Sequence, residues 1–277
     1  MKKFGLTGFP LGHSLSPAIH SRLFAMSGTH CIYELMEIRP EDLFTEASRL
    51  KQLDGFNVTI PHKTEIISLL DGLDEKAALF GAVNTVKVAD GRLTGYNTDC
   101  TGFLSALALA DLTLSGSVLI CGAGGVARMI AYESVLAGCE VTVAVRASSS
   151  AKASKLRKEI REKLNRDITV TNISCVNGPF DLLVNGTPAG MYPKTDAMPV
   201  CAETVKACRA VFDTIYNPEE TLLLKTCREN GIKCAGGMAM LVGQAAKAQE
   251  IWLGTHFTDL QILEVIGQTR KELEAAI

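Results

Sequence analysis

The sequence has little that would take it outside the ordinary globular proteins. No apolar run approaches the length of a membrane span, and no basic stripe interleaved with aromatic residues marks a nucleic-acid surface. The nine cysteines include no C-x-x-C pair and the five histidines have no ligand spacing, so we expect reduced thiols and no metal site. Two N-terminal lysines give way to Gly and Pro within a few residues, which argues against a signal peptide and for a cytoplasmic protein.

What is present fits a two-domain α/β protein. The chain has 277 residues, 47% of them hydrophobic, and a formal net charge of −2. That length suggests two domains at about 150 residues each. In the first 100 residues, strands and helices alternate as in an α/β domain. We expect strands at 4–8, 31–38, 55–60, 82–88 and 92–96, helices at 17–26, 40–50 and 62–70, and a turn at 90–91.

The clearest local signal is the segment 117–127, SVLICGAGGVA. An apolar run typical of a strand buried on both faces leads into glycines, and 126–137 has helical composition. A second apolar strand from Glu140 completes a βαβ unit with a G-x-G-x-x-A turn, the dinucleotide fingerprint in its proper context. Gly122 would allow the turn and Gly124 the approach of a pyrophosphate, although a tight turn without a ligand is the alternative.

The residues after this second strand bear on the choice of nucleotide. No carboxylate stands where NAD-binding domains place one on the ribose. Arg146 is there instead, followed by serines at 148–150, by Lys152 and by a basic helix expected over 150–164. A cation backed by hydroxyls accepts a 2′-phosphate, so NADP is favoured over NAD. The alternative is that Arg146 is a solvated surface cation.

Polar side chains also fall at turns and strand ends. Ser14 and Ser16 precede a helix that starts at Pro17, so both hydroxyls can face one anion, although capping alone would explain Ser16. Lys63 stands at an expected helix start, where the dipole disfavours a cation and eases loss of the proton, as a general acid or base requires. A surface lysine is the alternative. Further candidates, which could equally be caps or turns, are Asn57, Thr59, Asn84, Thr85, 97–99, 185–188, 213–218 and Gln244.

Seven motifs together identify a family. They are G-x-P-x-x-H-S-x-S-P-x-x-H at 8–20, N-V-T-I-P-H-K at 57–63, G-A-V-N-T at 81–85, N-T-D at 97–99, G-A-G-G at 122–125, N-G-T-P-A-G-M at 185–191 and G-M-A-M-L-V-G-Q-A-A at 237–246. In this combination the sequence resembles the shikimate dehydrogenase family over nearly its whole length. The first two motifs are specific to that family.

The resemblance implies reversible hydride transfer between NADPH and 3-dehydroshikimate, which yields shikimate in aromatic amino-acid biosynthesis. It implies that Lys63 is the general acid or base, with Asp99 beside it. The implied substrate ligands are Ser14, Ser16 and Tyr216 for the carboxylate, and Thr59, Asn84, Asp99 and Gln244 for the ring hydroxyls. The implied cofactor ligands are Gly122, Ala123, Gly124, Gly125, Val126, Arg146, Thr187, Ile215 and Gly237.

The implied architecture has a substrate-binding and catalytic domain over 1–100. The C-terminal helices, 238–277, return to complete this domain. A Rossmann-type, doubly wound NADP-binding domain spans 101–237. A small-molecule substrate is the expected partner, without nucleic acid or membrane, and a homodimer is allowed.

The chain departs from the family at the cofactor arginine. Val145 and Ala147 replace the polar residues usual on either side of Arg146, which leaves some use of NAD open. Two alternatives remain open: a quinate or dual shikimate/quinate dehydrogenase, with either NADP or NAD as its cofactor, and a nucleotide-binding regulator without catalysis. The two intact serines favour shikimate, and the presence of Lys63 and Asp99 disfavours the regulator.

Overall fold

The chain divides into two compact α/β units. A computed structural model describes residues 1–12, 14–176 and 178–275. Unit 1 comprises Met1–Gly102 and Val242–Ile277, and unit 2 comprises Phe103–Leu241. His13 of the first motif and residues 276 and 277 lie outside the described residues. Among the described residues, no helix is both long and apolar enough to cross a bilayer.

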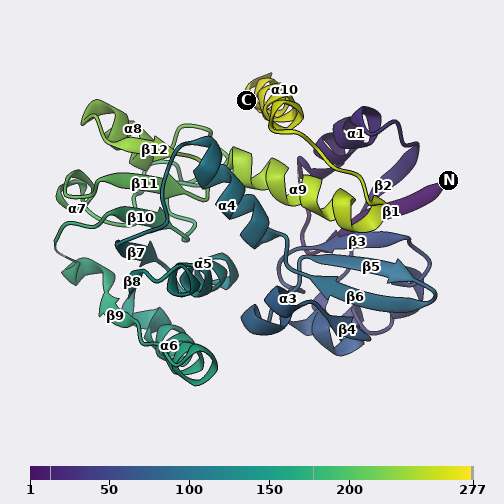
Figure 1. The fold of residues 1–277 in the computed structure, drawn as a ribbon, viewed down its shortest axis with the longest axis horizontal. Coiled ribbons are helices and arrows are strands. Elements are labelled where there is room, and N and C mark those ends of the chain that lie inside the picture. Colours follow the sequence, from purple (N-terminus) through teal and green to yellow (C-terminus); the bar gives the residue numbers. More distant parts are fainter. Residues whose placement is uncertain (13, 177, 276–277) are drawn as a thin grey trace. The chain divides into compact units, whose positions relative to one another are not determined.

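Unit 2 is built on a parallel sheet in the order β12-β11-β10-β7-β8-β9 (Figure 1). The order reverses between β7 and β10, and doubly wound sheets bind ligands at the carboxyl ends of the strands beside such a switch point. The predicted Rossmann-type arrangement is confirmed. The strands are β7 (Ser117–Cys121), β8 (Glu140–Val145), β9 (Thr169–Asn172), β10 (Leu182–Asn185), β11 (Ala210–Asp213) and β12 (Lys233–Ala235).

Helices cover the unit 2 sheet and exclude water from its strands. Leu119 and Cys121 of β7 pack with Val205 and Leu223 in one buried cluster, while Val118 and Ile120, which alternate with them, are also fully buried. A strand buried on both faces explains why the run from Val118 is continuously apolar. The helices of this unit are α5 (Gly125–Leu136), α6 (Ser150–Leu164), α7 (Ala202–Lys206) and α8 (Leu222–Glu229).

Unit 1 is built on a mixed sheet in the order β2-β1-β3-β5-β6-β4. Its strands β5 and β6 form a hairpin whose turn residues Asp90 and Gly91 have φ of 51° and 73°, as a type I′ turn requires. The strands are β1 (Lys2–Gly8), β2 (Cys31–Glu37), β3 (Gly55–Val58), β4 (Gly72–Leu73), β5 (Thr85–Ala89) and β6 (Arg92–Tyr96). The helices are α1 (Ser16–Met26), α2 (Ala47–Leu50), α3 (Glu75–Phe80) and α10 (Asp259–Ala275), together with α4 (Asp99–Leu109) and α9 (Met238–Leu253), which both cross the boundary between the units.

The C-terminal helix α9 is joined to the unit 1 sheet through Trp252. The indole stacks on Phe4 of β1, with ring centroids 4.6 Å apart, and its Nε1 donates to the Val86 carbonyl at 2.9 Å. A Cβ at Gly55 would lie 2.4 Å from this Nε1, so only glycine allows β3 to pass beneath the ring. This packing explains why residues distant in sequence belong to unit 1.

Three helix predictions in unit 1 were wrong in detail. The helix expected over 40–50 is a 3₁₀ turn, Pro40–Asp42, followed by the short α2; Thr45 Oγ1 donates to the Asp42 carbonyl at 2.8 Å and competes with helical bonding. The helix expected over 62–70 is a 3₁₀ segment, Glu65–Leu69. Ser16 is the first residue of α1, not its N-cap. Helix α3 was not predicted; Asp74 caps it by accepting from the Ala77 amide at 2.8 Å.

Candidate active site

Unit 1 brings together a lysine and a carboxylate from different elements. Lys63 lies in the turn after β3, and Asp99 is the first residue of α4. Lys63 Nζ donates to Asp99 Oδ2 at 2.6 Å, and the two side chains are 22% and 14% exposed. Shielding from bulk water strengthens such a charge-assisted bond and leaves the ammonium partly accessible.

Asn84 holds the second oxygen of the same carboxylate. Its Nδ2 donates to Asp99 Oδ1 at 2.9 Å, and its Oδ1 accepts from the Thr98 amide at 2.7 Å. Gln244 of α9 comes to the same place, with its Oε1 3.5 Å from Asn84 Nδ2. Four of the predicted site residues are therefore assembled in one polar cluster: Lys63, Asp99, Asn84 and Gln244.

A buried polar layer adjoins this cluster; Asn57 and Thr85 of this layer were candidates from the sequence, whereas its other members were not. Asn57 accepts from the Tyr33 hydroxyl at 2.8 Å and donates to Thr85 Oγ1 at 3.0 Å. The His20 ring stacks on Tyr33 with centroids 4.1 Å apart, and Gln249 Nε2 donates to His20 Nδ1 at 3.1 Å. Burial lowers the pKa of His20 to about 3, so the ring is neutral. The sequence signal for this layer was the presence of polar residues within otherwise apolar strands.

Ser14, Ser16 and Thr59 lie half-buried at the ends of elements. The Ser16 amide donates to Ser14 Oγ at 3.2 Å. Leu15 occupies the N-cap position of α1, and its side chain makes no capping hydrogen bond. Capping therefore does not account for the Ser16 hydroxyl. Thr59 follows β3, and its amide donates to the Thr7 carbonyl at 2.8 Å.

Unit 2 has a pocket of about 580 Å³ at the carboxyl ends of its strands. Gly122 has φ +106°, and a Cβ there would lie 3.0 Å from the Gly186 carbonyl oxygen. This is the close-packed glycine turn that the fingerprint predicts. Predicted cofactor residues that line the pocket are Gly122, Ala123, Gly124, Arg146 and Thr187. Lining residues outside the predicted cofactor ligands include Ser149, Lys152, Ile173, Lys194 and 197–199.

The remaining predicted cofactor residues lie beside this pocket or on neighbouring loops. Gly125 and Val126 begin α5, whose first N–H groups are free to meet an anion. Ile215 follows β11, and the Gly237 amide donates to its carbonyl at 2.9 Å. Tyr216, the predicted ligand of the substrate carboxylate, also belongs to unit 2, and burial raises the pKa of its hydroxyl.

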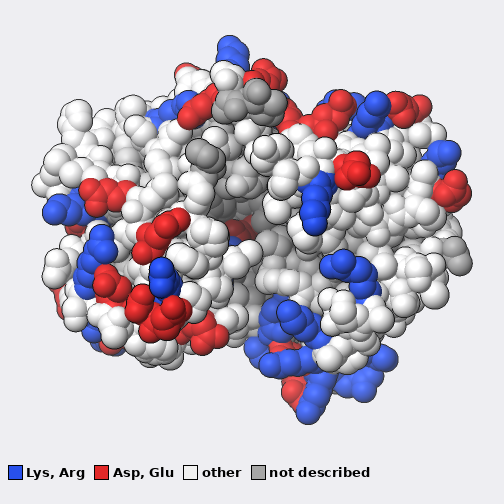
Figure 2. All heavy atoms as spheres, turned by 180° about the vertical axis from the view of Figure 1, so that it is seen from behind, with Lys and Arg blue, Asp and Glu red and all other residues white. Residues whose placement is uncertain are grey.

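The basic character of this unit is concentrated on α6, whose sequence is SAKASKLRKEIREKL. Figure 2 shows basic side chains gathered at one edge of unit 2. Lys152 is in the first turn of α6 and lines the pocket, together with Ser149, whose side chain makes no capping bond to the helix. A cation, a hydroxyl and a helix N-terminus thus accompany Arg146 at this end of the pocket.

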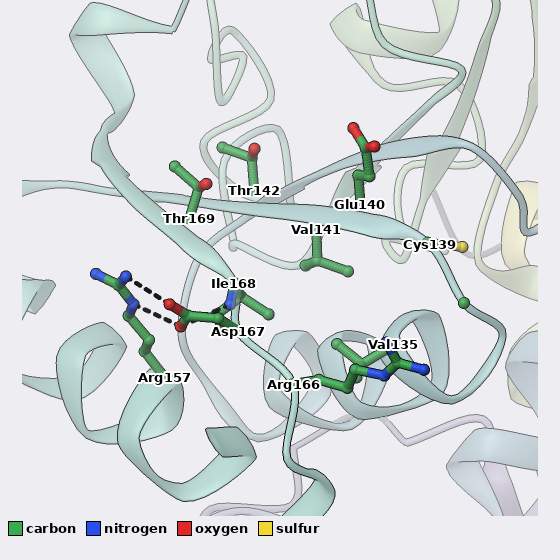
Figure 3. A pocket seen from close by; sticks show the side chains of 11 residues that line it. Val135, Cys139, Glu140, Val141, Thr142, Arg157, Arg166, Asp167, Ile168 and Thr169 are labelled. Carbon is green, nitrogen blue, oxygen red and sulfur yellow. Dashed lines mark hydrogen bonds and ion pairs between the residues drawn. The ribbon is translucent and has the colours of Figure 1, made fainter.

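A second hollow of unit 2 opens at the amino ends of β8 and β9 (Figure 3). There Arg157 donates two hydrogen bonds of 2.7 Å each to the Asp167 carboxylate, and Arg161 donates to the same carboxylate at 2.5 Å. These cations lower the pKa of Asp167 well below its usual range. The Asp167 charge is paired within the hollow, and the hollow lies at the strand ends opposite the glycine turn, so it is a poor nucleotide site.

Fold and site together define a class: a dinucleotide-binding protein with a second α/β unit that carries a lysine–carboxylate pair. The model of the shikimate dehydrogenase substrate binding domain matches residues 6–86. The NADP(+) shikimate dehydrogenase of Caldanaerobacter subterraneus subsp. tengcongensis is 40% identical over 262 residues, covering 92% of this chain and 93% of the relative. The chain therefore belongs to the shikimate dehydrogenase family.

Solved structures agree with this membership. The Thermus thermophilus shikimate 5-dehydrogenase in complex with NADP(H) and shikimate is 32% identical, with a TM-score of 0.86 and coverage of 97% of this chain and 100% of that one. A ligand-free 5-ketofructose reductase of a Gluconobacter strain is 30% identical, with a TM-score of 0.82 and coverage of 96% and 98%. The fold therefore also serves a reductase with another named substrate.

Proposed function

We propose that the protein catalyses the reversible reduction of 3-dehydroshikimate to shikimate with NADPH. The observation that carries the proposal is the Lys63–Asp99 pair, joined at 2.6 Å and fixed from the other side by Asn84. Residues 6–86 of the same chain match the model of a shikimate dehydrogenase substrate binding domain. A regulator without catalysis would not need such a pair.

The chemistry requires a hydride at the ketone carbon and a proton at the ketone oxygen, and bound NADPH supplies the hydride. Lys63 donates the proton to the oxygen in reduction and removes it from the hydroxyl in oxidation. Asn84 fixes the Asp99 carboxylate, and the Thr98 amide fixes the Asn84 side chain. Asp99 therefore holds the Lys63 ammonium in one direction. The pair therefore acts as an oriented proton donor.

The substrate is a carboxylate with several hydroxyls, and unit 1 offers matching groups. Ser14 and Ser16 stand at the N-terminus of α1, where hydroxyls and the helix dipole favour a carboxylate. Thr59, Asn84, Asp99 and Gln244 supply donors and acceptors for the ring hydroxyls. Tyr216 remains a predicted carboxylate ligand.

The pocket of unit 2 fits NADP by the shape and charge of its lining. Its glycine turn leaves room for a pyrophosphate beside the N-terminus of α5, and Arg146, Ser149 and Lys152 offer cations and a hydroxyl to the 2′-phosphate. Val145 is 3% exposed and contributes only apolar surface there. Because Lys152 and Ser149 supplement Arg146, the loss of polar residues at Val145 and Ala147 still leaves NADP favoured over NAD.

We assign substrate binding and catalysis to 1–100 with 238–277, and NADP binding to 101–237. The observed units change over within a few residues of these boundaries, at Gly102 and Val242. A reducing compartment, the cytoplasm, suits the free thiols of the described residues. A homodimer stays a prediction that light scattering at several concentrations would test.

The proposal is tested by mixing the purified protein with shikimate, quinate or 5-ketofructose and the matching cofactor forms, and following the absorbance of reduced nicotinamide. Shikimate with NADP⁺ should give much the largest kcat/KM. Equal or faster turnover of quinate or with NAD⁺ would place the protein with the dual-specificity dehydrogenases. Faster reduction of 5-ketofructose would assign it to the ketose reductases, and no turnover with any pair would favour the regulator.

A further inference from the structure

A buried carboxylate lies under the loops that border the unit 2 pocket. Strands β10 and β11 are neighbours, and their last residues, Asn185 and Asp213, are partners in the parallel register. Both side chains are fully buried, and Asn185 Nδ2 donates to Asp213 Oδ1 at 3.0 Å. The pair sits at the carboxyl ends of the strands, the edge where doubly wound sheets bind their ligands.

This pair is bonded to both loops that follow the strands. Asn185 Oδ1 accepts from the Thr187 amide at 3.0 Å and from Thr187 Oγ1 at 2.7 Å. Asp213 Oδ1 accepts from the Ile215 amide at 3.1 Å. The Ile215 carbonyl in turn accepts from the Gly237 amide at 2.9 Å. One carboxylate–amide pair therefore ties together three positions assigned to the cofactor: Thr187, Ile215 and Gly237.

The donors to Asp213 are all neutral. Besides the Asn185 amide and the Ile215 backbone, Thr221 Oγ1 donates to Oδ2 at 2.7 Å, while it caps α8 by accepting from the Leu224 amide at 3.2 Å. Burial raises the pKa of Asp213, and these hydrogen bonds oppose the rise. Burying a carboxylate that only neutral groups hydrogen-bond costs folding free energy. That cost is tolerated where both oxygens are needed as acceptors, and here each oxygen fixes a different segment of the chain.

We infer that Asp213 is a positioning residue for NADP: through Ile215 and through Asn185 it holds the loops of Thr187 and Gly237 in the geometry that receives the cofactor. The inference rests on the proposed NADP-dependent function. It predicts that disturbing Asp213 weakens cofactor binding, while the substrate groups proposed in unit 1, which make none of these bonds, stay in place.

The test compares Asp213→Ala with Asp213→Asn by equilibrium binding of NADP⁺ and by backbone hydrogen exchange. Asp213→Ala strands three buried donors and should raise the Kd for NADP⁺ about ten-fold or more, with faster exchange at the Thr187 and Ile215 amides. Asp213→Asn keeps an acceptor at Oδ1 and should stay within about three-fold of wild type.

Thr204→Val is the matched control, because the buried Thr204 Oγ1 donates to the Val176 carbonyl at 3.3 Å and neither residue is among those that line the pocket. It should lower the melting temperature without changing the Kd. An unchanged Kd in folded Asp213→Ala, or an equal loss in Asp213→Asn, would overturn the positioning role.

Should Asp213→Ala not fold, Thr221→Val decides the question, because it removes one donor to Asp213. A Kd no higher than that of Thr204→Val would then refute the inference. A wild-type protein that binds no NADP⁺ would instead overturn the proposed function.

Discussion

Replacing Lys63 by methionine tests the proposed proton donor with little change in side-chain length. In the wild type, Nζ donates to Asp99 Oδ2 at 2.6 Å while Asn84 holds Oδ1 at 2.9 Å. The variant loses only the first of these bonds, so the carboxylate and its amide partner stay in position. We therefore expect the effect to fall on proton transfer and not on substrate binding.

The magnitude follows from the role. A positioned general acid or base contributes roughly 10²- to 10⁴-fold to turnover, so kcat for shikimate oxidation should fall by that factor. The KM for shikimate should change by less than about three-fold, because an interaction made only in the transition state affects kcat and kcat/KM alike. Lys51→Met, at an exposed lysine of the same unit, is the matched control and should leave both constants unchanged.

Steady-state rates at saturating NADP⁺ and varied shikimate measure both constants. Circular dichroism would show that the variant is folded. A Lys63→Met protein that keeps more than about a tenth of the wild-type kcat would refute the assignment, since solvent cannot replace an oriented donor to that extent. A raised KM at constant kcat would mean that Lys63 serves only to bind substrate.

Three further predictions concern the cofactor and stability. Arg146→Ala and Lys152→Ala should each weaken NADP⁺ binding about ten-fold and leave NAD⁺ binding unchanged, as titrations would show; equal losses for both nucleotides would contradict a 2′-phosphate site. Trp252→Phe should lower the free energy of unfolding by about 1–2 kcal/mol in urea, because the Val86 carbonyl loses its buried donor; no loss would mean that water replaces the indole. His20 has a pKa of about 3 in the folded protein against 6.5 unfolded, so the unfolded chain binds more protons as pH falls. Stability should drop by about 2 kcal/mol from pH 7 to pH 5, and His20→Gln should lack this slope.

Local signals carried the prediction of unit 2. The glycine turn at Gly122 needs only its neighbours: an apolar strand before it, a helix after it, and a backbone that adopts φ of +106°. The α6 helix matches its expected bounds, Ser150–Leu164, because its composition favours helix throughout and Asn165 adopts a left-handed cap, with φ of 51°. Such features depend little on the rest of the chain.

Tertiary packing overrode local preference in unit 1. The segments 40–50 and 62–70 have the residues of helices, yet Leu43 and Ile66 are fully buried in one core cluster with Phe56 and Val86. Anchoring these side chains against the sheet fixes the path of the chain, and short 3₁₀ turns follow that path where a regular helix does not. Nothing within either segment specifies the cluster, so propensity alone predicts the wrong geometry.

The candidate active site depends on a pairing register that no local pattern reveals. Asn84 directly precedes β5, Asp99 follows β6, and they meet because Thr85 pairs with Tyr96 across the hairpin. A shift of one residue would turn Asn84 to the other face of the sheet and leave Asp99 with the lysine alone. The register is set by the two-residue turn at 90–91, whose positive φ values suit Asp and Gly. The distance between two site residues is therefore encoded in a turn that contributes no group to the site, and only the resemblance to a family could join them in advance.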